Sequence, residues 1–291
     1  MTRRFILVAL SAATAVLVPA TSTRAQNSDS AGTPASRHAG FLPRPAFRPL
    51  IADPNEPQTG AALRSGDFTR RGSIDGIASF GASLPIVGFT PGRFIIQIGA
   101  AGGAIARFDM KTLANDIVSE DYEVGIPVWI QAGRMGARFR IYHRSSHIGD
   151  EFVLNNPDFT RFDLTYEAVE SILAASFRRA RAYLGADYIY DNVTTDIDPG
   201  VLRAGVDMIS ESGFATGSMR GRFVAGIDLK ASNDLEWRVG KSAVAGVELS
   251  RIESRFPSMR ILVELFSGPS EAGQFYGRTE RYVGIAAYVN P

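Results

Sequence analysis

The ten residues Tyr142–Glu151 bring together side chains that can do acid–base and nucleophilic chemistry. They read Tyr-His-Arg-Ser-Ser-His-Ile-Gly-Asp-Glu, so His143 stands two positions before Ser145. Residues at positions i and i+2 of a β-strand point to the same face, which places this imidazole within reach of this hydroxyl. An imidazole beside a hydroxyl is the minimum that nucleophilic ester chemistry needs, provided that a third group orients the ring.

The block therefore suggests catalytic roles. Ser145 is the predicted nucleophile and His143 is the predicted general base, with His147 as the alternative base. The group that orients the imidazole ring is expected among three nearby carboxylates: Asp150, Glu151 and Glu120. Glu120 belongs to this set because counting back across a predicted hairpin at 132–135 places it opposite His147.

Two other interpretations of the block stay open. His147, Asp150 and Glu151 carry ligands that suit a hard or borderline cation, so calcium is the one cofactor that this interpretation adds; otherwise no cofactor or metal ligand is expected. Tyr142 and His143 are also amphipathic side chains of the kind that settle at a membrane interface, which would give the block a purely structural role.

The composition of the 291-residue chain is that of a folded protein, with 45% apolar and 21% charged residues. The chain contains no cysteine, which excludes a disulfide scaffold, a thiolate zinc site and a cysteine nucleophile. Its 31 basic and 30 acidic residues give a net charge of +1, so no nucleic-acid partner is expected.

The first part of the chain has the pattern of a secretory signal peptide. Two arginines near the N-terminus precede an apolar run at 5–18, and a small-residue cleavage site follows near Ala25. Residues 1–25 are therefore expected to be removed on export. Residues 26–58 are rich in serine, alanine and proline, and we expect a flexible leader followed by a Pro-rich extended arm.

From residue 59 to residue 291, apolar and polar side chains alternate with a period of two. This period is typical of β-strands that have one apolar face and one polar face. The segment 93–108 is a clear example, and similar segments follow it to the end of the chain. Counting them from Ser73, with one more near 62–69, gives an even number of about twelve strands.

The polar faces of these strands carry arginines and acids in near-equal number. The charges predicted to face one interior are Arg93, Arg107, Arg138, Arg140, Arg161, Arg181, Arg203, Arg222, Arg238, Arg260, Asp121, Glu123, Asp163, Glu167, Asp187, Asp207, Asp228, Glu248 and Glu264. A soluble sandwich would turn the apolar faces inward, whereas a membrane barrel turns them toward lipid and satisfies every backbone hydrogen bond by closure. We therefore predict an all-β, closed antiparallel transmembrane β-barrel over residues 59–291, with paired charges in its lumen.

Loop lengths predict the orientation of this barrel. Short links near 89–91 and 132–135 alternate with long ones such as 148–158 and 267–279. Bacterial outer-membrane barrels have short periplasmic turns and long external loops. The Tyr142–Glu151 block is therefore expected at the outer leaflet of the outer membrane, and the expected partners are outer-membrane lipid and the barrel-assembly machinery.

The segment His143-Arg144-Ser145 resembles the His-x-Ser of outer-membrane phospholipase A and of lipid A deacylase. The catalytic pairs of these families face the outer leaflet from the barrel exterior, so the resemblance implies acyl-ester hydrolysis. A broader resemblance is to an uncharacterised bacterial family of predicted outer-membrane barrels, a domain of unknown function. It rests on Leu-Ile-Ala-Asp-Pro-x-Glu-Pro at Leu50–Pro57, on the Tyr142–Glu151 block and on Tyr-Glu-Ala-Val at Tyr166–Val169, and it implies fold and compartment.

The sequence thus predicts an exported, integral outer-membrane β-barrel with a candidate His/Ser site that faces lipid. If the protein is an enzyme, the expected activity is hydrolysis of a lipid acyl ester, of the phospholipase A or lipid A deacylase type. The alternatives are a narrow pore or transport barrel and a purely structural surface barrel. The oligomeric state is left open.

Overall fold

The computed structural model describes residues 36–39, 44–68, 71–161, 164–192, 197–252 and 258–290. The predicted signal peptide and residues 26–35 of the predicted leader lie outside these ranges. The strands that form the barrel are β2 (Thr59–Asp67), β3 (Arg71–Thr90), β4 (Phe94–Asp109), β5 (Ile117–Ala132), β6 (Met135–Ile148), β7 (Thr165–Phe177), β8 (Ala180–Asn192), β9 (Gly200–Thr216), β10 (Met219–Ser232), β11 (Val239–Arg251), β12 (Ser258–Pro269) and β13 (Thr279–Asn290).

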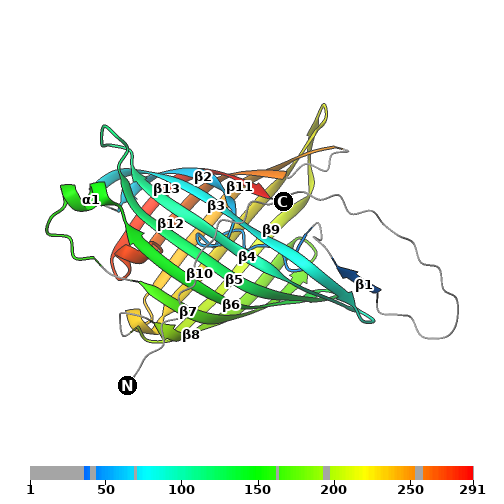
Figure 1. The fold of residues 1–291 in the computed structure, drawn as a ribbon. Coiled ribbons are helices and arrows are strands. Elements are labelled where there is room, and N and C mark those ends of the chain that lie inside the picture. The colour runs from blue at the N-terminus through cyan, green and yellow to red at the C-terminus, as the bar shows by residue number, and fades with distance from the viewer. Residues whose placement is uncertain are drawn as a thin grey trace, which may run out of the picture. The chain divides into compact units, whose positions relative to one another are not determined.

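These twelve strands form one closed antiparallel barrel (Figure 1). Each strand pairs with the next along the chain, and β13 pairs with β2 to complete the ring. Closure confirms the predicted twelve-stranded barrel, and it leaves no open edge in the ring, as a lipid environment requires. A further short strand, β1 (Ser36–Ala39), pairs with the last residues of β3, where this 20-residue strand extends beyond β2.

The apolar side chains of the barrel strands point outward. Phe80 on β3 is 78% exposed, Ile126 on β5 is 64% exposed and Leu184 on β8 is 69% exposed. The alternate positions face the lumen, where Arg138 and Glu170 are almost fully buried. Soluble proteins rarely expose apolar surface that surrounds the whole molecule, whereas a barrel in lipid must do so. The orientation predicted from the alternation is therefore confirmed for most strands.

Strand β7 differs from the predicted alternation. The sequence pattern places Tyr166 and Ala168 on the lipid face and Glu167 in the lumen, but the structure shows the reverse. Ala168 is fully buried inside the barrel, and the Glu167 side chain is 46% exposed on the outer surface. The apolar residues here line the inside of the barrel mouth, so their hydrophobicity does not mark the lipid face. The register shift between β7 and β8 lies between Glu167 and Ala168.

Three arginines predicted in the lumen are instead exposed in connections. Arg93 lies in the turn between β3 and β4, Arg161 in the loop after β6, and Arg238 in the loop before β11. The adjoining strands end before these positions, so the period of two no longer applies to them. Asp163, which the sequence pattern also places in the lumen, lies outside the described residues.

The two ends of the barrel differ in the length of their connections. The turns at 91–93, 133–134 and 178–179 are short. The connections at the other end are longer and carry α1 (Asp150–Asn155), η1 (Asn233–Leu235) and η2 (Gly273–Phe275). In Figure 1, α1 and β1 lie at opposite ends of the barrel. No helix among the described residues is both long enough and apolar enough to cross a membrane.

The outward apolar face predicts how the barrel responds to a charge in the middle of a strand. We expect Ile126→Arg to lower the free energy of unfolding in lipid vesicles by about 2–4 kcal/mol, because the guanidinium would then lie in hydrocarbon. Urea unfolding followed by tryptophan fluorescence measures the change. Leu113→Arg, in the exposed loop between β4 and β5, is the control and should change stability by less than about 0.5 kcal/mol. Equal losses in the two variants would contradict a lipid-facing position for Ile126.

Candidate functional site

Three of the predicted site residues share the outer face of β6 near its long-loop end. His143, Ser145 and His147 lie at alternate positions of this strand, which ends at Ile148. The residues that alternate with them along β6 are buried inside the barrel: Tyr142, Arg144 and Ser146. The strand therefore brings both imidazoles and the Ser145 hydroxyl to one exterior surface, as their spacing suggests.

A carboxylate from the neighbouring strand lies beside the first histidine. Glu167 on β7 is the cross-strand partner of His143, and its Oε1 lies 3.6 Å from His143 Nδ1. Both side chains are a little under half exposed. A carboxylate at Nδ1 can hold the ring and leaves Nε2 available to a hydroxyl or a substrate. Glu167 is absent from the residues that the sequence predicts at this site. The connection between β6 and β7 is long, so the register that pairs Glu167 with His143 cannot be counted from the sequence.

A second carboxylate lies across from the other histidine. The β5–β6 register pairs Glu120 with His147, in agreement with the hairpin count, and pairs Tyr122 with Ser145. The Tyr122 ring meets the His147 ring edge to face, with 5.8 Å between their centroids. Ser145 therefore lies between two histidines, each of which has an acidic residue opposite it on a neighbouring strand.

Asp150 and Glu151 begin α1, beyond the end of β6. Both are exposed, and a carboxylate oxygen of Asp150 lies 3.7 Å from Arg161. In the described part of the chain, no three histidine, aspartate or glutamate side chains are grouped closely enough to hold a metal ion. His147, Asp150 and Glu151 are not grouped in this way among the described residues. The catalytic roles suggested for both acids stay predictions.

The outer surface next to His143, on the side away from the long-loop end, is apolar. Val124 on β5, Ile141 on β6 and Val169 on β7 are 56%, 57% and 39% exposed on the same outer face. Among the described side chains, none is hydrogen-bonded to the Ser145 hydroxyl. A hydroxyl beside an imidazole on such a surface is accessible to a molecule whose apolar chains lie against the barrel, and it is remote from water-soluble substrates in the lumen.

Inside the barrel, the lumen behind this face is occupied by residues 44–58 of the Pro-rich arm (Figure 1). Leu50 is fully buried and Phe47 is 3% exposed. The backbone oxygens of Arg48 and Pro49 accept hydrogen bonds from Arg181 of the barrel wall. The arm thus packs its apolar side chains against buried apolar residues of the barrel wall such as Trp129 and Ile172.

Two carboxylates tie the arm to arginines of the barrel wall. Arg138 donates a hydrogen bond to Glu56 at 2.6 Å, and Arg203 is paired with Asp53. Burial opposes ionisation of Asp53, but the charges of Arg203 and Lys230 hold its pKa below the usual range. The Asp53 carboxylate is therefore charged and binds its arginine as an ion.

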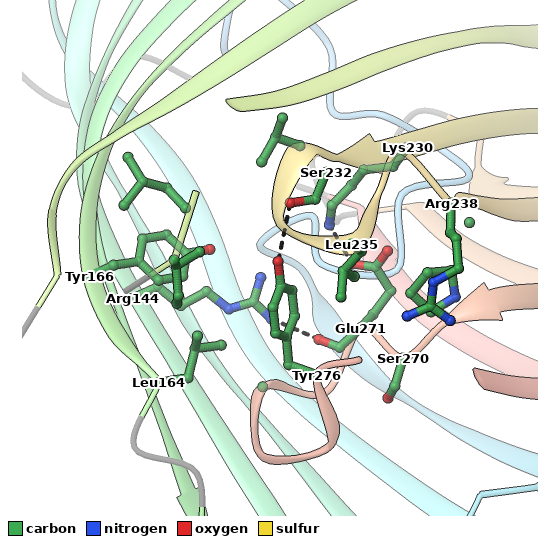
Figure 2. A pocket seen from close by; sticks show the side chains of 16 residues that line it. Arg144, Leu164, Tyr166, Lys230, Ser232, Leu235, Arg238, Ser270, Glu271 and Tyr276 are labelled. Carbon is green, nitrogen blue, oxygen red and sulfur yellow. Dashed lines mark hydrogen bonds and ion pairs between the residues drawn. The ribbon is translucent and has the colours of Figure 1, made fainter. Parts of the chain in front are cut away.

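The connection that carries η2 folds over the long-loop mouth of the lumen (Figure 2). Glu271 is paired with Lys230, and its backbone oxygen accepts a hydrogen bond from Arg144 at 2.9 Å. The hydroxyls of Tyr276 and Ser232 are 3.1 Å apart and hydrogen-bonded. The cavity left among these side chains measures about 70 Å³, which has room for a few water molecules. The arm and this connection together fill the long-loop half of the lumen.

The ion pairs of the arm predict what keeps it in place. Because the chain has no cysteine, Ala52→Cys provides a unique thiol at a position that is 2% exposed. We expect Asp53→Asn combined with Glu56→Gln to raise the rate of maleimide labelling of this thiol by about tenfold or more, because both removed charges neutralise buried arginines. Leu113→Cys, in an exposed loop, is the control and should be labelled equally fast with and without the two substitutions. Unchanged protection at position 52 would show that packing alone holds the arm.

Solved structures of outer-membrane enzymes share this fold. The outer membrane phospholipase A from Escherichia coli matches with a TM-score of 0.54 and 11% identity, over 85% of this chain and 95% of that chain. An active-site mutant of that enzyme, with asparagine replaced by alanine, matches with a TM-score of 0.51 and 12% identity, over 84% and 92%. The Salmonella typhi outer membrane phospholipase dimer with bound calcium matches with a TM-score of 0.49 and 12% identity, over 82% and 93%. At such identities the two matches with TM-scores above 0.5 show a common barrel fold and nothing beyond it.

The family of the chain is shown by its sequence. No curated protein matches it significantly. A family model described as a protein of unknown function matches residues 13–290, which is nearly the whole chain, and it agrees with the resemblance carried by Leu50–Pro57, Tyr142–Glu151 and Tyr166–Val169. The chain therefore belongs to the family of proteins of unknown function called DUF1207.

Proposed function

We propose that this protein is a bacterial outer-membrane barrel that hydrolyses an acyl ester of a lipid at the outer surface of β6 and β7. The observation that carries the proposal is the position of His143, which has Ser145 two residues away on its own strand face and Glu167 at its Nδ1. A hydroxyl, an imidazole and a carboxylate in this order form the arrangement that activates a serine nucleophile.

The position of the site supports a lipid as the substrate. The three residues lie at the long-loop end of an apolar outer surface, which is the external end in outer-membrane barrels. A lipid of the outer leaflet would place its ester linkages at this depth and its acyl chains against Ile141 and Val169. Export by the predicted signal peptide and insertion by the barrel-assembly machinery are parts of this proposal. The E. coli and Salmonella typhi proteins of the same fold are described as phospholipases, which agrees with this substrate class.

The proposed reaction proceeds through an acyl-enzyme. Ser145 Oγ attacks the ester carbonyl carbon while His143 Nε2 takes the hydroxyl proton, and the same proton passes to the leaving alcohol oxygen as the carbon–oxygen bond breaks. Water then attacks the acyl-enzyme, with His143 as base, and releases a fatty acid and the free serine. Glu167 stabilises the imidazolium that forms in both steps and holds the ring in place.

Release of fatty acid from phospholipid and from lipid A by the purified protein in detergent tests this function. We expect Ser145→Ala and His143→Ala to abolish release, and Glu167→Gln to lower its rate by roughly 10²-fold or more, because it removes the charge that orients the base. Ser146→Ala is the matched control, since the neighbouring serine points into the barrel and is 1% exposed. Activity that survives Ser145→Ala, or a wild-type protein that releases nothing from either lipid, would overturn the proposal.

The second histidine and its opposite carboxylate give an independent check of the assigned base. We expect His147→Ala and Glu120→Gln to keep the rate within about threefold of wild type, because neither side chain contacts His143 or Glu167. The same fatty-acid assay measures both variants. Loss of activity in His147→Ala, with activity retained in His143→Ala, would transfer the role of base to His147 and contradict the assignment made here.

A further inference from the structure

Over most of the length of the lumen, the arginines of the barrel are paired with acids. Six buried pairs show this: Arg64–Glu264, Arg107–Glu280, Arg138–Glu170, Arg140–Glu123, Arg181–Asp207 and Arg203–Asp53. Such pairing is expected, because an uncompensated charge inside a protein is costly. Where arginines outnumber acids around an open cavity instead, their charges are accessible to an anion from outside the barrel.

The balance fails in a cavity at the short-turn end of the barrel. This cavity measures about 370 Å³, and its wall is formed by the arm on one side and by residues of β3 and of β9 to β13 on the other. Among the described residues, its lining contains six arginines, namely Arg44, Arg48, Arg220, Arg222, Arg251 and Arg260, and a single acid, Glu248. The described lining side chains therefore sum to a charge of +5.

The single acid is already engaged. Glu248 accepts a hydrogen bond from Arg260 at 3.1 Å and is also paired with Arg222. Within the described ranges, the guanidinium groups of the other four arginines have no acidic partner, and all four residues are exposed, so that an anion from solvent can reach them. Two of these four, Arg44 and Arg48, belong to the arm. The arm therefore supplies acids to the arginines deeper in the lumen, and it supplies positive charge at the short-turn end.

We propose that this cavity binds a phosphate-bearing anion with at least two negative charges. Guanidinium groups bind phosphate oxygens through paired N–H donors, and several of them around one cavity suit a compact group with multiple charges. A phosphate carries about −1.5 to −2 charges at pH 7, so two phosphates would neutralise most of the lining. The volume lies within the range of roughly 300–1,000 Å³ of small-molecule sites and exceeds what a single inorganic ion fills.

The position of the cavity indicates two sources for the phosphate-bearing anion. In the orientation of the proposed function, the short-turn end faces the periplasm, so the anion is either the headgroup of an inner-leaflet phospholipid or a soluble phosphate compound. Binding at this site does not depend on ester hydrolysis at Ser145, which lies on the opposite side of the wall and toward the other end of the barrel. A failure of either proposal therefore leaves the other testable.

Isothermal titration calorimetry with pyrophosphate tests the site in the full chain, purified in an uncharged detergent. We expect saturable binding that weakens as salt is raised, and a dissociation constant at least tenfold higher in Arg220→Gln and in Arg251→Gln. Arg93→Gln, at a turn of the same barrel end but outside the cavity lining, is the control and should bind as wild type does. Retained heat-modifiable migration on gels shows that each variant is folded. Absence of binding, or equal weakening by all three substitutions, would overturn the proposal.

Competition with short-chain phosphatidylglycerol then distinguishes the two sources. Displacement of pyrophosphate by this lipid, but not by short-chain phosphatidylcholine, would support the site with a phospholipid headgroup as its natural occupant. Pyrophosphate binding that neither lipid displaces would support the site with a soluble phosphate compound. Displacement by both lipids to the same extent would overturn it, because an apolar surface and not the arginines would then determine binding.

Discussion

Hydrogen bonding between the backbones of neighbouring strands is the interaction on which the rest of this structure depends. Hydrocarbon offers no partner to an N–H or C=O group, so a sheet in lipid must close on itself. The pairing of β13 with β2 provides that closure, and the alternation along the strands then assigns most side chains to lipid or lumen. Apolar residues such as Ile126 can lie on the outside only because this ring is complete.

Closure creates an interior that must be filled with polar groups. Arg138 shows how this is achieved, because it binds Glu170 of the barrel wall and Glu56 of the arm at the same time. Removing Arg138 would leave Glu56 buried without its arginine, and breaking a buried ion pair in this way costs about 3–5 kcal/mol. The arm is therefore part of the core of the molecule, whereas Arg220 and Arg251 of the cavity at the short-turn end are exposed and are not part of such a group.

The outer site depends on the rigidity that closure gives to adjacent strands. His143 and Ser145 are held by one strand, and Glu167 reaches His143 from the next, so the geometry does not rely on a mobile loop. Val169 and Ile141 form an apolar outer surface on one side of these three residues, and the proposed lipid substrate would lie against it.

The period of two along the sequence determined the barrel, its strand number and the outward direction of most apolar residues, because alternation is a local property of each strand. It also determined that His143, Ser145 and His147 share a face. Two features needed the tertiary structure. The partner of His143 depends on the β6–β7 register across a long connection, and the burial of the arm depends on arginines such as Arg138 and Arg203 that are far from it in the chain. Neither relation is local, so only the closed barrel decided them.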